Sequence, residues 1–284
     1  MTADLLPGAD GAARRAAVCG KPIGHSLSPV IHRAGFAAAG LTDWSYDAIE
    51  CAEADLPALV AGLGPEWAGL SLTMPLKEAA LALSTSATAV AQATGAANTL
   101  IRRADGWHAD NTDVSGMVRV LRDAGVGTAP TVTVLGGGGT ARAALAAAAQ
   151  LGATTVSVVT RRPEAVAELA PAAAALGVTL AGVAWTAAPS ACDADVVIST
   201  VPKGVADPLA PAIAWRGGTV LFDALYDPWP TPLAASAVAS GLPVVSGLDL
   251  LLAQGLGQFE QFTGVRPAPE PAMRAALLAA AAQR

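Results

Sequence analysis

The sequence has few of the residues that build metal sites, disulfides and nucleic acid interfaces. Its 284 residues include three cysteines (Cys19, Cys51 and Cys192) and three histidines, spread widely along the chain. Because neither type shows the spacing of a metal or redox motif, we predict no metal site and expect the cysteines to be small buried apolar side chains. Charged residues make up 14% of the chain and the formal net charge is −6. This acidic balance argues against nucleic acid as the main partner.

Long runs of strongly apolar residues are also missing. Hydrophobic residues reach 53% of the chain, but alanine supplies much of that share, and polar residues, glycine and proline interrupt the alanine-rich stretches 143–151 and 169–185. Because no stretch offers about 20 strongly apolar residues, we predict no transmembrane helix and no membrane partner. Residues 1–15 lack the apolar core of a signal peptide, so we expect a loose tail on a cytoplasmic protein.

The pattern of apolar runs predicts an α/β protein. β-rich runs alternate with longer helical ones, and a second series begins at Thr131. The turn dipeptide Asp105-Gly106 predicts a hairpin. The last two helices have no strand between them and could pack back onto the first half. The predicted strands are 16–22, 43–49, 67–72, 97–103, 106–110, 131–135, 155–160, 195–199 and 219–222, and the predicted helices are 29–39, 53–62, 77–83, 113–124, 140–152, 248–262 and 270–282.

A glycine-rich loop follows the strand at 131–135 and opens a helix. Gly136-Gly137-Gly138-Gly139-Thr140-Ala141 fits G-x-G-x-x-A, which binds dinucleotides in this context. Gly136 would allow the tight turn, and Gly138 would let a pyrophosphate approach the backbone at the helix N-terminus. Ala141 would permit close packing of helix on strand. We therefore predict a Rossmann-type domain.

The following strand ends in Thr160-Arg161-Arg162. An NAD-binding unit usually carries an acidic residue there, which holds the ribose 2′-hydroxyl. Two guanidinium groups instead suit a 2′-phosphate, and Thr160 could add a hydroxyl. The alternative is that both arginines are solvated residues before a helix that starts at Pro163. We favour NADP(H) as the cofactor.

The stretch HSLSPVIH at residues 25–32 places two serines just before a predicted helix. Pro29 suits the first helical position and Ser28 the N-cap, which leaves Ser26 unexplained. In an extended approach to the helix both hydroxyls point the same way, beside an N-terminus that favours anions. An anion site and a simple helix cap remain alternatives.

Lys77 and Asp113 each follow the end of a predicted strand. Ligands of open α/β sheets bind outside the carboxyl ends of the strands, so the two side chains could meet in one cleft. Taken singly, Lys77 could also be a solvated residue at a helix start, and Asp113 an N-cap.

Eight segments then follow one another in a characteristic order. They are KPIGHSLSP at 21–29, SLTMPLK at 71–77, GAANTL at 95–100, DNTDVSG at 110–116, LGGGGTAR at 135–142, STVPKG at 199–204, DALYDPWPTPL at 223–233 and GLDLLLAQGLGQFEQFTG at 247–264. Together they make the chain resemble the shikimate dehydrogenase family from about Val18 to about Arg274. The resemblance implies a substrate-binding domain of residues 1–112 and 249–284, and a Rossmann NADP-binding domain of residues 113–248.

The family resemblance implies reversible, NADPH-dependent reduction of 3-dehydroshikimate to shikimate in aromatic amino-acid (chorismate) biosynthesis. The partners would be these small molecules, and the protein a monomer or homodimer. One alternative is a catabolic quinate/shikimate dehydrogenase, often NAD-dependent, against which residues 160–162 and Ser28 argue. Others are a non-catalytic shikimate-type sensor, against which Lys77 and Asp113 argue, and a reductase of an altered shikimate analogue.

The resemblance also implies roles for individual residues. Lys77 would be catalytic, with Asp113 as its partner. Ser26 and Ser28 would hold the substrate carboxylate, Thr73, Asn98, Asp113 and Gln254 would bind its ring hydroxyls, and Tyr226 would contact it. The cofactor would be held by Gly136, Gly137, Gly138, Gly139, Thr140, Thr160, Arg161 and Arg162, with Ala224 and Gly247 near the nicotinamide.

Gln254 is assigned by the resemblance alone. On the helix predicted from Leu248, spacing groups it with Gln258 and Gln261 away from an apolar stripe, which is typical of a solvated surface. Some positions depart from the family's common pattern: Ser71 stands in place of an asparagine, and Gly137 and Thr140 in place of alanines. None removes a catalytic side chain.

Overall fold

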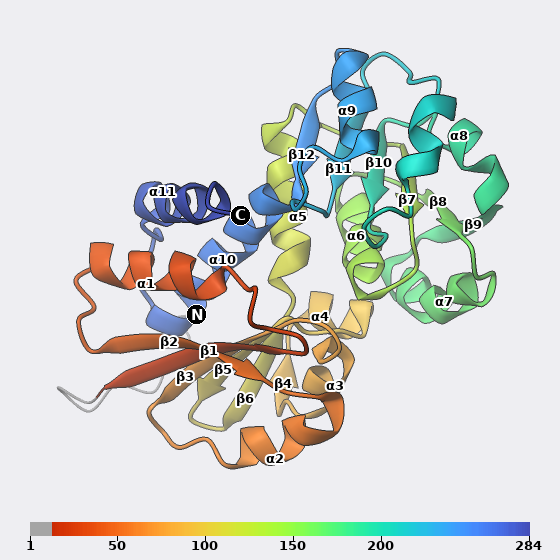
Figure 1. The fold of residues 1–284 in the computed structure, drawn as a ribbon. Coiled ribbons are helices and arrows are strands. Elements are labelled where there is room, and N and C mark those ends of the chain that lie inside the picture. Colours follow the sequence, from red (N-terminus) through yellow and green to blue (C-terminus); the bar gives the residue numbers. More distant parts are fainter. Residues whose placement is uncertain (1–12) are drawn as a thin grey trace. The chain divides into compact units, whose positions relative to one another are not determined.

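The computed structural model describes residues 13–284 as two compact units (Figure 1). Unit 1 contains the chain up to Thr112 and Gln254–Arg284, and unit 2 contains Asp113–Ala253. Two helices carry the chain from one unit to the other: α5 (Thr112–Asp123) and α10 (Gly247–Thr263). The sequence placed the second of these boundaries a few residues earlier, at the start of α10.

Unit 1 is built on a six-stranded mixed sheet in the order β2-β1-β3-β5-β6-β4. β1, β2 and β3 are parallel, β5 runs antiparallel to β3, and β5 and β6 form the predicted hairpin, with Arg103 paired to Gly106. The strands are β1 Arg14–Gly20, β2 Trp44–Glu50, β3 Trp67–Leu72, β4 Ser86–Ala87, β5 Thr99–Arg103 and β6 Gly106–Asp110.

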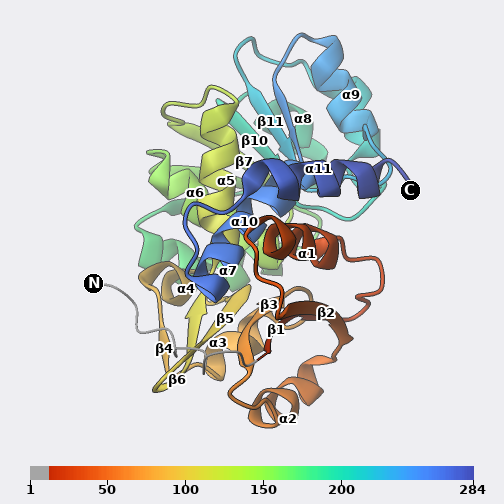
Figure 2. The same cartoon turned by 90° about the vertical axis from the view of Figure 1, so that its left-hand side faces the viewer.

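The helices of unit 1 lie on both faces of this sheet. α1 (Ser28–Ala38) packs against α11 (Glu270–Ala281) on one face, and α2 (Leu56–Ala61) lies on the other (Figures 1 and 2). Under α2 the core is mostly aliphatic, with Leu56, Leu70 and Leu100 fully buried. The remaining helical elements are η1 Glu53–Asp55, α3 Lys77–Ala82, α4 Ala89–Thr94 and the part of α10 from Gln254 onward.

Unit 2 has an all-parallel six-stranded sheet in the order β12-β11-β10-β7-β8-β9. Two three-stranded halves therefore diverge from the adjacent strands β7 and β10, which is the doubly wound arrangement of dinucleotide-binding folds. The strands are β7 Thr131–Leu135, β8 Thr155–Thr160, β9 Thr179–Ala184, β10 Val196–Ser199, β11 Val220–Asp223 and β12 Val244–Ser246.

Both faces of the unit 2 sheet are buried, so its strands read as near-continuous apolar runs. Alternate strand residues pack against α5, α6 and α7 on one face and against α8 and α9 on the other. Seven residues of α6 are buried, six of them alanines, because small side chains let this helix lie close to the sheet. The helical elements are α6 Gly139–Gln150, α7 Glu164–Leu176, η2 Trp185–Ala187, α8 Ala188–Ala191, η3 Asp207–Ala212 and α9 Pro232–Ala239.

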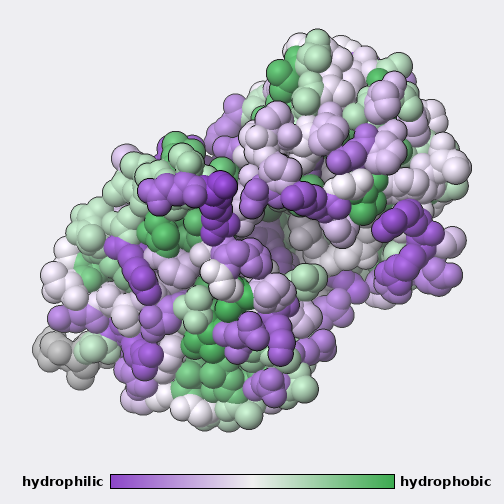
Figure 3. Space-filling view, viewed as in Figure 1, coloured by the Kyte–Doolittle hydropathy of each residue, from purple (hydrophilic) through white to green (hydrophobic). Residues whose placement is uncertain are grey.

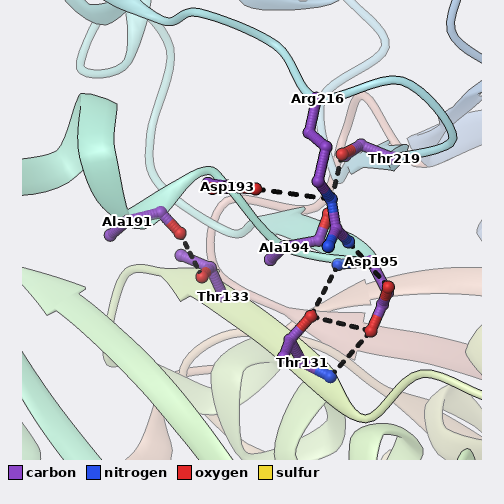
Figure 4. Close-up of polar contacts among 8 residues, drawn as sticks. All are labelled: Thr131, Thr133, Ala191, Asp193, Ala194, Asp195, Arg216 and Thr219. Carbon is purple, nitrogen blue, oxygen red and sulfur yellow. Dashed lines mark hydrogen bonds and ion pairs between the residues drawn. The ribbon is translucent and has the colours of Figure 1, made fainter.

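A polar cluster joins the amino ends of three strands of unit 2 (Figure 4). Asp195 Oδ2 accepts hydrogen bonds from the backbone N–H of Thr131 at 2.9 Å and from its hydroxyl at 2.7 Å. Arg216 lies 2.6 Å from Asp195 Oδ1 and 3.4 Å from Asp193. The bond to Thr131 and the Arg216 guanidinium lower the pKa of Asp195. The cluster therefore fastens β7, β10 and the segment before β11 together at the edge opposite the glycine loop.

The sequence missed several elements, mostly short ones. β4, α4, α8, α9, β9 and β12 were not predicted. A helix start at Pro163 was considered as an alternative, but α7, whose alanine-rich sequence contains Pro171, was not among the predicted helices. At the N-terminus β1 begins at Arg14, and Arg15 lies 4.4 Å from the centre of the Trp67 ring, so both arginines belong to the sheet and not to the expected tail. Residues 1–12 of that tail lie outside the described part of the chain.

No helix among residues 13–284 has the length and hydropathy needed to span a membrane, and no group of three or more histidine, cysteine, aspartate or glutamate side chains there could hold a metal ion. Hydrophilic residues cover much of the visible face of each unit, with hydrophobic residues between them (Figure 3).

Candidate functional site

The serine motif begins α1 differently from the predicted cap. Ser28 is the first residue of the helix and Leu27 the N-cap, so the assignment of Ser28 as N-cap is wrong. Ser26 Oγ instead accepts a hydrogen bond from the backbone N–H of Ser28 at 3.3 Å. Among residues 13–284 the Ser28 hydroxyl has no hydrogen-bond partner, although Ser28 is only 5% exposed. Ser26 thus has a local structural use, and Ser28 keeps its hydroxyl available.

Backbone hydrogen bonds gather three of the sequence motifs at the carboxyl end of β3. The N–H of Lys21, which begins the serine motif, bonds to the carbonyl of Met74 at 3.1 Å. The N–H of Leu72 bonds to the carbonyl of Asn98 at 2.7 Å, and the N–H of Ala97 to the carbonyl of Lys77 at 2.8 Å. Lys77 is the first residue of α3 and is half-buried. The motifs at 21–29, 71–77 and 95–100 therefore lie together.

Asn98 lies at the centre of a buried hydrogen-bonded group. Its Oδ1 accepts from the backbone N–H of Thr112 at 2.8 Å, and its Nδ2 lies 3.0 Å from Thr112 Oγ1. The same Nδ2 lies 3.4 Å from Gln254 Oε1 on α10. The amide groups of Asn98 and Gln254 thus contact each other, and both side chains are less than 10% exposed.

The prediction of a solvated glutamine face on α10 is wrong. Gln254 is 8% exposed and Gln258 only 1%, while the half-buried Gln261 bonds to Asp110 at 2.8 Å. The helix is enclosed on its glutamine side as well as its apolar side, and a hydrophobic-periodicity argument cannot distinguish a buried polar face from a wet one. Gln258 was missed for this reason, and the only signal was its place one turn after Gln254.

Asp113 is the second residue of α5 and is 7% exposed, so it is not the N-cap of that helix. It is the first residue of unit 2, whereas Lys77 belongs to unit 1. The predicted pairing of Lys77 with Asp113 stays a prediction.

In unit 2 the glycine loop has the conformation that the sequence predicted. Gly136 has a φ of +112°, which favours glycine, and its N–H bonds to the carbonyl of Val159 at 2.9 Å. A Cβ built on Gly138 would meet no atom within 4 Å. Among residues 13–284, none accepts a hydrogen bond from the N–H groups of Gly138, Gly139 or Thr140. These donors open α6, and N–H groups at a helix N-terminus generally favour anions.

The two arginines that follow β8 differ in their contacts. Arg162 forms a two-pronged contact with Glu168, with both nitrogen–oxygen distances at 3.4 Å, whereas Arg161 has no partner among residues 13–284. The Thr160 hydroxyl is used locally, because it accepts from the N–H of Arg162 at 3.1 Å. Of these three residues, only Arg161 has a charged group without an ion-pair or hydrogen-bond partner among residues 13–284.

The segment after β11 is held tightly against the start of α10. The N–H of Gly247 bonds to the carbonyl of Leu225 at 3.1 Å, and a Cβ on Gly247 would lie 2.1 Å from the Ala224 oxygen and 3.1 Å from Tyr226 Cδ1. Only glycine fits there. Asp223, whose pKa burial raises, accepts from the Leu225 N–H at 3.2 Å and from the Thr231 hydroxyl at 2.7 Å. These bonds fix the path of Ala224 and Tyr226.

Comparisons with known proteins cover most of the chain. Residues 18–100 match the shikimate dehydrogenase substrate binding domain and residues 247–278 the shikimate 5′-dehydrogenase C-terminal domain. Residues 131–225 match the family described as NADP oxidoreductase coenzyme F420-dependent. A shikimate dehydrogenase (NADP(+)) of Maricaulis maris is 38% identical over 94% of this chain and 96% of its own.

Solved structures show the same likeness. The crystal structure of Mycobacterium tuberculosis shikimate dehydrogenase has a TM-score of 0.85 and 46% identity, covering 94% of this chain and 99% of that one. The Thermus thermophilus enzyme, solved in complex with NADP(H) and shikimate, has a TM-score of 0.81 and 31% identity, covering 94% and 99%.

Proposed function

The chain belongs to the shikimate dehydrogenase family, and we propose that it catalyses the reversible, NADPH-dependent reduction of 3-dehydroshikimate to shikimate. This reaction is a step of the chorismate pathway to the aromatic amino acids. The observation that carries the proposal is the buried pair of Asn98 and Gln254, whose amide groups lie 3.4 Å apart, within hydrogen-bond distance. Adjacent ring hydroxyls, each both donor and acceptor, match such a pair.

The residues of unit 1 would bind and orient the substrate. We propose that Ser26 and Ser28 hold its carboxylate, because the Ser28 hydroxyl is buried at the start of α1 with no protein partner among the described residues. Thr73 and Asn98 would bind the ring hydroxyls together with Gln254. Holding the reacting carbon at near-contact distance from a hydride donor is mainly a positioning task.

The chemical role falls to Lys77. Its ammonium group would donate a proton to the C3 oxygen during reduction and accept it during oxidation. Asp113 would orient that ammonium group and bind the neighbouring hydroxyl, and Tyr226 would contact the substrate.

The residues of unit 2 fit NADP(H). The open space above Gly138 and the donors of Gly138, Gly139 and Thr140 suit a pyrophosphate, and Arg161 suits a 2′-phosphate. Gly136 and Gly137 would shape that loop, Thr160 and Arg162 would flank Arg161, and Ala224 and Gly247 would lie near the nicotinamide. When bound, NADPH supplies the hydride.

All these residues belong to one chain, so the proposal is compatible with a monomer or a homodimer. Because NADPH and shikimate are small polar metabolites, we propose that the protein works in the cytoplasm. No nucleic acid or membrane partner is required.

The test follows NADPH absorbance with shikimate and with quinate, each offered with NADP and with NAD. We expect rapid turnover of shikimate with NADP. Turnover of quinate with NAD would instead assign the protein to quinate catabolism. Folded protein that binds shikimate but turns over no pair would be a non-catalytic sensor.

A further inference from the structure

A chain of buried hydrogen bonds crosses unit 1 from β2 to Asn98. The Tyr46 hydroxyl lies 2.6 Å from Ser71 Oγ, which lies 2.7 Å from Gln258 Oε1. Gln258 Nε2 lies 3.0 Å from Thr99 Oγ1, which lies 2.7 Å from Asn98 Oδ1. Five side chains from β2, β3, α10 and the start of β5 thus form one continuous series.

The direction of every bond in this series follows from the backbone groups at its ends. Gln258 Nε2 also lies 3.1 Å from the Asn98 carbonyl, which can only accept, so the NH₂ group faces Asn98 and the Oε1 faces Ser71. Asn98 Oδ1 accepts from the Thr112 backbone N–H, which can only donate. The hydroxyls between them therefore donate from Tyr46 toward Gln258 and from Thr99 toward Asn98.

Solvent cannot replace these bonds, because the series is almost completely enclosed. Tyr46 and Thr99 are 0% exposed, Gln258 1%, Asn98 2% and Ser71 4%. The His32 ring stacks on Tyr46 with centroids 4.1 Å apart, and burial raises the pKa of the Tyr46 hydroxyl, which keeps it a neutral donor. Removing one hydrogen-bonding group from such an enclosed series leaves a buried polar group without a partner, which costs free energy.

We propose that Gln258 is a positioning residue that presets the Asn98 side chain for the substrate, acting through Thr99. With its Oδ1 bonded to Thr99 and the Thr112 N–H, Asn98 must point its NH₂ group toward Thr112 Oγ1 and Gln254. Without Gln258, the Thr99 hydroxyl can turn to Thr112 Oγ1, 3.4 Å away, and release Asn98. The inference rests on the proposed substrate role of Asn98.

The experiment compares Gln258→Leu with Gln261→Leu on the same helix. Gln261 bonds to Asp110 and not to the series, so it is a matched control for the loss of a glutamine. We expect Gln258→Leu to raise KM for shikimate about tenfold, with a smaller change in kcat, as for a lost buried hydrogen bond. KM for NADP should not change, and Gln261→Leu should leave both KM values unchanged.

Asn98→Ala and the double variant distinguish positioning from general destabilisation. If Gln258 acts through Asn98, Gln258→Leu should raise KM no further once Asn98 is alanine, because coupled residues are not additive. Multiplied effects in the double variant would overturn the inference. If KM were unchanged in Gln258→Leu but raised in Asn98→Ala, the positioning role of Gln258 would be overturned and the substrate role of Asn98 would stand. An unchanged KM in Asn98→Ala would overturn the substrate role of Asn98 as well.

Gln258→Glu provides a second variant with nearly the same shape, should the leucine variant fold poorly. Its protonated carboxyl can still accept from Ser71 and donate one bond, whereas its carboxylate can donate none. KM for shikimate should therefore rise with pH in this variant more than in the parent protein. Parallel pH profiles would contradict the inference.

Discussion

The clearest test of the cofactor site is the substitution Arg161→Gln, with Arg162→Gln as its control. The two arginines are neighbours on one exposed turn after β8, but only Arg162 is bound to a carboxylate, that of Glu168. Arg161 has no partner among the described residues, so its guanidinium can bind a 2′-phosphate without first breaking an ion pair.

The expected size of the effect follows from the bonds at stake. Hydrogen bonds to charged groups contribute about 1.5–3 kcal/mol, which corresponds to roughly a tenfold to hundredfold change in binding. Because the turn is exposed, salt screens the contact and the lower part of that range applies. We therefore expect Arg161→Gln to reduce the preference for NADP over NAD by about tenfold, through KM for NADP. Arg162→Gln should change the preference by less than about threefold, since Glu168 already neutralises that charge.

Initial rates with NADP and NAD, at saturating shikimate and two salt concentrations, measure the preference directly. Glu168→Gln adds an opposite perturbation: it frees Arg162 and should raise the preference for NADP. An unaltered ratio in Arg161→Gln, or a larger loss in Arg162→Gln, would refute the reasoning and shift the 2′-phosphate contact to Arg162.

Three further expectations concern catalysis, the glycine positions and acid stability. Lys77→Ala should lower kcat by roughly 10²–10⁴-fold with a smaller change in KM, and near-normal kcat would exclude Lys77 as the proton donor. Gly138→Ala should raise KM for NADP but leave the melting temperature unchanged, because a Cβ at this position meets open space in the protein. Gly247→Ala should lower the melting temperature, because its Cβ would meet the Ala224 oxygen. Equal melting temperatures in the two variants would contradict this reasoning. Burial lowers the pKa of His32 from 6.5 to about 3. Above pH 6.5 the ring is therefore neutral in the folded and the unfolded state, and between pH 6.5 and about 3 only the unfolded chain binds the proton. As the pH is lowered, the free energy of unfolding should then fall by up to about 1.4 kcal/mol per pH unit. Urea unfolding of His32→Phe should lack this part of the loss. Identical dependence of the unfolding free energy on pH in the variant and the parent would contradict the role of His32.

The α/β class and the second sheet could be predicted because their signals are local. Apolar strands, the loop at Gly136 and the helix that follows occupy a single stretch of sequence, and the parallel sheet of unit 2 confirms that part of the prediction. Short elements such as β4 and α4 could not be found, because two to six residues carry too little periodicity. In α7 alanine gives almost no contrast between a buried and an exposed face.

The polar interior of unit 1 could not be predicted from spacing. From spacing alone Gln254 and Gln258 look like a solvated stripe, but the fold buries both side chains and places Gln258 against β3 and β5. The sequence also could not separate Arg161 from Arg162, because Glu168 reaches back to only one of them. Family resemblance supplied Gln254, but nothing in the sequence indicated the series from Tyr46 to Asn98.

The cluster of Asp195, Thr131 and Arg216 has a consequence for engineering. It closes the amino edge of the unit 2 sheet, whereas the glycine loop and Arg161 lie at the carboxyl ends of β7 and β8. The residues that fasten these strands and the residues that we propose to select the cofactor are thus at opposite ends of the same strands. Cofactor preference can therefore be redesigned by replacing the carboxyl-end loops, while the amino-end bonds keep the strands in register. Variants that lose cofactor binding should still unfold as cooperatively as the parent.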